Sequence, residues 1–168
     1  MMAKKVLIAY YSHSGNTEKL AKAIQSKTDG VLFEVKEKDP YPQNHQAVVD
    51  QAKKEIGEGF KPALKAKVDD IDTYDTVFVG SPNWWYTIAP PVATFLAEHD
   101  MTDKTIIPFY THGGGGAGSI EKDIAKLCPG SKLQGGLSFE FPYFFQAQSK
   151  RESWGSKSGG RKKACKPT

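Results

Sequence analysis

The fold is decided by one stretch near the N-terminus, Val6-Leu7-Ile8-Ala9-Tyr10-Tyr11-Ser12-His13-Ser14-Gly15-Asn16-Thr17. Its first half is an uninterrupted apolar and aromatic run, which is typical of a strand buried on both faces of a parallel sheet. Its second half is polar, contains one glycine and leads into a helical pattern that begins at Asn16. A buried strand, a turn and a helix in this order predict the first βα unit of an α/β domain.

The same alternation continues along the chain. Apolar segments predict further strands at 31–35, 76–80, 105–110 and 133–141, and helical patterns lie at 47–56, 92–99 and 119–127. Alternation of this kind, with right-handed crossovers, predicts a doubly wound parallel sheet of five strands with helices on both faces. In such sheets the ligand binds beyond the carboxyl ends of the strands. Three unusual loops leave predicted strands there, at 12–17, 81–90 and 111–118.

Length and composition indicate one globular domain. The chain has 168 residues, of which 39% are hydrophobic and 25% charged. No apolar run near the N-terminus is long enough for a signal peptide or a membrane span, and the two cysteines have no metal-ligand spacing. We therefore expect a reduced, cytoplasmic protein. The net charge is +4, but residues 147–168 alone hold seven basic residues and one acidic residue. The rest of the chain is therefore mildly acidic, and no nucleic-acid partner is expected.

The first loop has the features of an anion site. It joins a predicted buried strand to a helix N-terminus, where free backbone amides and the helix dipole favour an anion. The side chains of Ser12, Ser14, Asn16 and Thr17 add neutral donors around Gly15, and the loop has no lysine or arginine. The alternative is that Ser14 or Asn16 caps the helix. No triphosphate-binding lysine, dinucleotide glycine triple or loop cysteine is present, so these donors predict a site for a terminal phosphate.

The second loop is aromatic. Pro82 and Asn83 precede three adjacent aromatic residues, Trp84, Trp85 and Tyr86. Three such rings at a strand end cannot all point into the core, and an exposed cluster is costly unless it meets a flat ligand or a partner. We interpret the set as a stacking wall for a planar ring; the alternative is that one tryptophan seals the edge of the sheet.

The third loop is rich in glycine. Thr111 and His112 are followed by four glycines, beginning with Gly113 and Gly114. Glycines let the backbone approach a ligand closely, and their N–H groups can donate to ring carbonyl oxygens. The alternatives are a flexible linker and, for His112, a packing or hydrogen-bonding role rather than an acid/base role. A phosphate site, a stacking wall and a donor loop at one sheet edge together predict flavin mononucleotide (FMN) as the ligand.

At these residues the chain resembles the flavodoxin family, over about residues 4–139. The resemblance implies a sheet in the order 2-1-3-4-5, FMN as cofactor and a redox function. It also implies that residues of the first loop hold the phosphate, His13 through its backbone, and that residues of the other two frame the ring. The residues implied are Ser12, His13, Ser14, Gly15, Asn16, Thr17, Pro82, Asn83, Trp84, Trp85, Tyr86, Thr111, His112, Gly113 and Gly114.

The C-terminus departs from the family pattern. We assign 4–141 to the FMN-binding domain and 142–168 to an atypical basic tail, in which no helical apolar face is visible. The tail is interpreted either as a disordered extension or as the product of a shifted reading frame. Either interpretation leaves part of one sheet face without its covering helix, which predicts reduced stability or self-association through that face.

Three functions are compatible with these features. The first is an FMN electron carrier whose partner is another redox protein. The second is an FMN-dependent NAD(P)H reductase of small quinone-like or nitro acceptors, which the aromatic wall and the uncharged loops favour. The third is a flavin-free scaffold in which the loops bind a partner.

Overall fold

The computed structural model describes residues 5–112 and 116–140. Its strands are β1 (Val6–Tyr10), β2 (Val31–Glu34), β3 (Thr76–Pro82), β4 (Thr105–His112), β5 (Lys132–Leu133) and β6 (Leu137–Glu140). Its helices are α1 (Asn16–Thr28), α2 (His45–Glu58), α3 (Pro90–Glu98) and α4 (Ile120–Leu127), with one turn of 3-10 helix, η1 (Ile71–Thr73). The tail assigned to 142–168, Gly113 and Gly114 lie outside the described residues.

The sheet is parallel and has the order β2-β1-β3-β4-β5, which confirms the predicted topology. β1 is an inner strand, with Leu7 paired to Val31 of β2 on one side and to Val77 of β3 on the other. Four of its five residues are buried. This position explains why the run has no polar alternation, since both of its faces meet apolar side chains.

The prediction of one continuous fifth strand at 133–141 is wrong. The segment forms two short strands, β5 and β6, which both pair with β4. The Gln134 amide donates to the Ile106 carbonyl at 2.9 Å, so the backbone polar groups of Ile106 point toward the fifth strand. Because Pro108 is two residues further along β4, its backbone carbonyl and nitrogen point to the same side. The ladder is interrupted at Gln134-Gly135-Gly136, where the glycines disfavour a strand and Pro108 offers no N–H. The amide of Gly136 donates to the Glu121 carboxylate at 3.2 Å.

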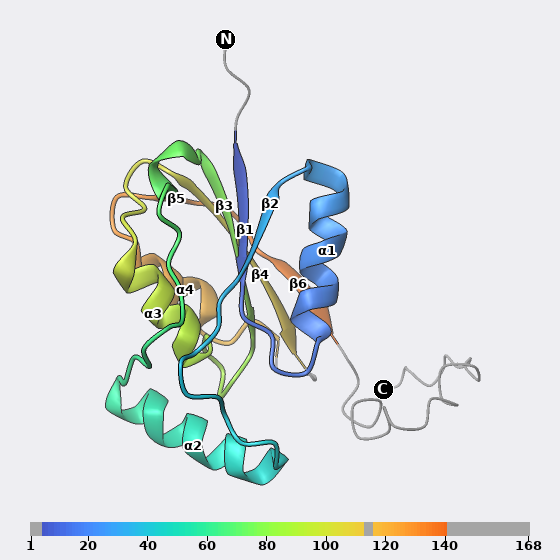
Figure 1. The fold of residues 1–168 in the computed structure, drawn as a ribbon, viewed down its shortest axis with the longest axis vertical. Helices are drawn as coiled ribbons and strands as arrows, with labels where there is room; N and C mark the ends of the chain where they lie inside the picture. The colour runs from blue at the N-terminus through green and yellow to red at the C-terminus, as the bar shows by residue number, and fades with distance from the viewer. Residues whose placement is uncertain (1–4, 113–115, 141–168) are drawn as a thin grey trace, which may run out of the picture.

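Helices cover both faces of the sheet. Figure 1 shows α1 on one side and α3 with α4 on the other. On the α3 and α4 side the largest buried side chains are Leu7, Val77, Phe95, Leu96, Ile106, Ile120 and Ile124. On the α1 side the buried cluster is smaller and consists of Ile8, Tyr10, Ala21, Ile24 and Phe109. Beside it, Leu137 and Phe139 of β6 are 46% and 48% exposed, in register with Phe109 and Thr111.

α2 covers neither face. In Figure 1 it lies beyond the carboxyl ends of the strands, across the edge where the three loops emerge. Its start is fixed by Asn44, whose side chain accepts the Ala47 amide at 2.9 Å, and it ends at Gly59 with φ of 68°. α2 is therefore placed to contribute to a site at that edge. Among the residues that the structure describes, no helix is long and apolar enough to cross a membrane.

Candidate functional site

The first loop forms a preorganised N-terminus for α1. Gly15 adopts φ of 97°, a left-handed conformation that favours glycine, and it directs the chain from β1 into the helix. The Ser12 hydroxyl oxygen accepts the amides of Gly15 at 3.0 Å and Glu18 at 3.2 Å. Within the described residues, the amides of Asn16 and Thr17 at the start of the helix have no partner. These two donors are therefore available to an anion.

Hydrogen bonds join the three loops into one structure. The hydroxyls of Thr17 and Thr111 lie 2.9 Å apart, although 94 residues separate them in the sequence. Asn83 donates from its backbone to the Thr111 carbonyl at 2.8 Å and from its side chain to the Gly116 carbonyl at 2.6 Å. The predicted convergence of the three loops at one edge is thus present in the described residues.

The aromatic loop turns sharply at Trp85 and Tyr86. Trp84 and Thr87 exchange backbone hydrogen bonds at 3.0 and 3.1 Å, and the two residues between them have φ of 53° and 65°. This is a two-residue turn with both central residues in the left-handed region, where each side chain costs about 1–2 kcal/mol. The Trp85 indole N–H donates to the Val49 carbonyl at 3.0 Å, and the Tyr86 carbonyl accepts the Ser119 amide at 2.6 Å. These bonds stabilise the strained turn.

Trp84 packs into a cluster of rings. Its ring centroid lies 5.2 Å from that of Tyr41, 5.6 Å from that of Tyr11 and 5.9 Å from that of His13, all in edge-on geometry. Such contacts hold the indole at the rim of the sheet with one orientation. The alternative that a tryptophan seals the sheet edge is therefore correct in part for Trp84, which packs against the core and also faces the site.

Two carboxylates support this cluster from behind. The Tyr41 hydroxyl donates to Glu55 at 2.5 Å, and Gln51 donates to the other oxygen of Glu55 at 2.8 Å. The Tyr11 hydroxyl donates to Glu37 at 3.4 Å. Burial, followed by these carboxylates, raises the pKa of both tyrosines above its usual value. Both hydroxyls donate to the carboxylates that face them.

The loops and α2 enclose a cavity of about 320 Å³. Ten of the predicted site residues line it, namely His13, Ser14, Asn16, Thr17, Pro82, Asn83, Trp84, Trp85, Thr111 and His112. The side chain of Ser12 is turned to the helix amides instead, and Gly15 supplies only the turn. Tyr86 is not among the lining residues and is 62% exposed. Gly113 and Gly114 lie outside the described residues.

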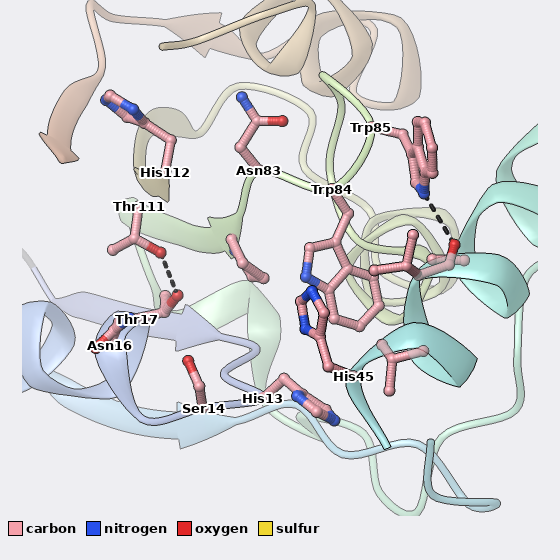
Figure 2. A pocket seen from close by; sticks show the side chains of 14 residues that line it. His13, Ser14, Asn16, Thr17, His45, Asn83, Trp84, Trp85, Thr111 and His112 are labelled. Atoms are coloured by element: carbon pink, nitrogen blue, oxygen red, sulfur yellow. Dashed lines mark hydrogen bonds between the residues drawn. The ribbon is translucent and has the colours of Figure 1, made fainter. Parts of the chain in front are cut away.

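Sequence reasoning missed one wall of the cavity. It is formed by His45, Val48, Val49 and Ala52, all from α2. Figure 2 shows the polar side chains of Asn16, Thr17, Thr111 and Asn83 on one side of the view and Trp85 with α2 on the other. The helical pattern at 47–56 was visible in the sequence, but nothing in it indicated that α2 crosses the carboxyl edge rather than covering a sheet face.

His112 serves as a hydrogen-bonding residue. Its Nδ1 accepts the Gly116 amide at 3.1 Å, and Nε2 lies 3.0 Å from the Ser138 hydroxyl. The ring therefore connects the third loop to β6.

The lining of the cavity is mostly apolar side chains, hydroxyls and amides. In the described part of the chain, its titratable side chains are three histidines, and no lysine, arginine, aspartate or glutamate lines it. No group of three metal-ligating residues occurs among the residues described. The site therefore offers hydroxyl, amide and backbone donors at one end and apolar side chains at the other.

Comparison with known proteins supports this description. A family model described as Flavodoxin matches residues 5–142. The chain is similar to a flavoprotein from Lactobacillus acidophilus solved in complex with FMN, with 27% identity, a TM-score of 0.70 and coverage of 90% of this chain and 100% of that one. Oxidised flavodoxin 2 from Bacillus cereus shares the fold, with 24% identity, a TM-score of 0.51 and coverage of 82% and 85%.

The chain is also similar to a protein that is named as an enzyme. The NAD(P)H dehydrogenase (quinone) of Sinorhizobium fredii is 27% identical over 151 residues, which are 86% of this chain and 74% of that protein.

Proposed function

The chain belongs to the flavodoxin family, and on that premise we propose that it transfers electrons with FMN as its cofactor. One observation carries the proposal. Two unpaired amides at the start of α1 lie on the same cavity as Trp84 and Trp85, so a phosphate site and an aromatic wall face one ligand.

The residues present fit this cofactor. The amides of Asn16 and Thr17, with the hydroxyl of Ser14, would hold the phosphate by neutral donors and the helix dipole. Ser12 accepts two amides but keeps its own hydroxyl proton, so it can still donate to the same anion. At the other end, Trp84 and Trp85 would contact the flat ring system.

When bound, FMN supplies the one- and two-electron chemistry that the side chains lack. The chain itself positions the cofactor and excludes water. The Thr17–Thr111 hydroxyl pair and the Asn83 bonds fix the loops relative to one another. Among the residues that the structure describes, no carboxylate lines the cavity. We therefore expect a less strongly reducing potential than in flavodoxins with acidic residues around the ring.

The test is a titration of the flavin-free protein with FMN and with riboflavin, which lacks the phosphate. We expect FMN to bind about tenfold more tightly or better, because only FMN uses the α1 amides. Shifted visible absorption and quenched flavin fluorescence would report binding. Equal affinities would refute the phosphate site, and no binding of either compound would favour the flavin-free scaffold.

A second candidate is an FMN-dependent NAD(P)H reductase of quinones or nitro compounds. The specific observation in its favour is the apolar wall of α2, which gives the cavity room and chemistry for a small ring. The name of the Sinorhizobium relative adds support. Oxidation of NADH or NADPH by the FMN-loaded protein, with a naphthoquinone as acceptor, distinguishes this enzyme from a carrier that reduces only another protein.

A further inference from the structure

α2 is attached firmly to the aromatic side of the cavity. The Trp85 indole N–H donates to the Val49 carbonyl at 3.0 Å, and the Lys53 ammonium lies 5.2 Å from the centre of the Trp85 ring. At the next turn, Glu55 accepts the Tyr41 hydroxyl at 2.5 Å, and Tyr41 in turn contacts Trp84. The helix is therefore a fixed wall of the cavity.

The chemistry of this wall differs from that of the loops. Val48, Val49 and Ala52 present aliphatic groups to the cavity beside the two tryptophans. His45 of α2 lines the same cavity, the Lys53 ammonium lies against the Trp85 ring, and Glu55 accepts the Tyr41 hydroxyl. Against the aliphatic groups of Val48, Val49 and Ala52 an uncharged ring loses little hydration, whereas a charged ligand loses more.

We propose that the space between α2 and the tryptophans, called here the α2 subsite, binds the electron acceptor as an uncharged planar ring, such as a quinone without acidic substituents. This inference rests on the proposed function, because the acceptor needs a reduced flavin as its neighbour. It also divides the cavity into a cofactor part and an acceptor part. The amides and hydroxyls of the loops hold the cofactor, and the aliphatic side chains of α2 select the acceptor.

The decisive variant is Val49→Asp, which places a carboxylate in the half-buried wall and leaves the backbone carbonyl that Trp85 uses. Gly57→Asp is the matched control, since it adds the same charge to the same helix at a position with open space around it and outside the cavity. Val49→Thr, close to valine in shape, is a milder second variant if the aspartate prevents folding.

The experiment measures equilibrium binding to the oxidised, FMN-loaded full chain, by calorimetry, without any reductant. The two probes are 2-methyl-1,4-naphthoquinone and 1,4-naphthoquinone-2-sulfonate, which differ mainly in charge. We expect the unmodified chain to bind the neutral probe at least about tenfold more tightly than the sulfonate. Val49→Asp should lower the affinity for the neutral probe by about tenfold, Val49→Thr should lower it by about threefold, and Gly57→Asp should lower it by less than about twofold.

A separate FMN titration of each variant keeps the two ideas apart. If Val49→Asp keeps an FMN affinity within about threefold of that of the unmodified chain and loses binding of the neutral naphthoquinone, the result supports the α2 subsite. Equal binding of the two probes, or equal loss of FMN and naphthoquinone in Val49→Asp, overturns it and assigns the wall to the cofactor. An unmodified chain that binds no FMN overturns the proposed function and the subsite with it.

Discussion

Replacing Tyr41 by phenylalanine tests whether the carboxylate behind the aromatic cluster stabilises the site. The Tyr41 hydroxyl donates to Glu55 at 2.5 Å, and the two side chains are buried, with 6% and 9% of their surface exposed. A hydrogen bond to a charged group contributes about 1.5–3 kcal/mol, and removal of one partner leaves the other buried with less solvation. Glu55 keeps only the bond from Gln51 at 2.8 Å.

We therefore expect Tyr41→Phe to lower the free energy of unfolding by about 2 kcal/mol, which for a domain of this size corresponds to a fall in Tm of about 4–8 °C. Urea unfolding followed by tryptophan fluorescence is a suitable assay, because the Tyr41 ring lies 5.2 Å from that of Trp84. Tyr86→Phe is the control, since that side chain is 62% exposed.

Glu55→Gln and the double variant complete a cycle that isolates the pair. If Tyr41→Phe destabilises the protein no more than Tyr86→Phe does, the reasoning from the buried carboxylate is refuted. A coupling energy near zero between Tyr41 and Glu55 would also refute the reasoning, even if each single variant were destabilised. The loss of stability would then come from changed packing and not from the hydrogen bond.

Three further predictions concern the loop, the pH response and the open face. Gly15→Ala should lower the free energy of unfolding by about 1–2 kcal/mol and weaken FMN binding about tenfold, because Gly15 has φ of 97°. Gly57→Ala is the control and should be stabilising, since Gly57 lies in a helix with open space around it. An unchanged FMN affinity in Gly15→Ala would remove this loop from the site. Burial raises the pKa of Cys128 to about 11 and, with Glu121, that of Tyr110 to about 12, so the folded state keeps protons that the unfolded state releases. The free energy of unfolding should then fall from pH 9 to pH 12, and a flat profile in urea unfolding would contradict this. Self-association of the full chain through the α1 side of the sheet should decrease in Leu137→Ser, measured by light scattering; equal association would assign the contact to another surface.

The strand order and the convergence of three loops could be predicted because both depend on local pattern. An apolar run without polar alternation, as in β1, requires burial on both faces, and a parallel sheet then brings all carboxyl ends to one edge. The break in the fifth strand does have a local signal, because it falls on Gln134-Gly135-Gly136 and adjacent glycines disfavour a strand. The contribution of Pro108 on the neighbouring strand, which offers no N–H, can be recognised only once the register is known.

The wall of α2 could not be predicted for a related reason. The pattern of Val48 and Ala52 shows that this helix buries one side, but an amphipathic pattern does not identify the surface on which that side packs. The deciding contacts are between distant segments: the Trp85 indole with the Val49 carbonyl, and Tyr41 with Glu55. The first of these depends on a turn that places two aromatic residues in a left-handed conformation, which their sequence disfavours. The strain at this turn is therefore informative. The chain keeps a costly conformation next to α2, and the cost is understandable if the position of Trp85 against α2 matters to what the cavity binds.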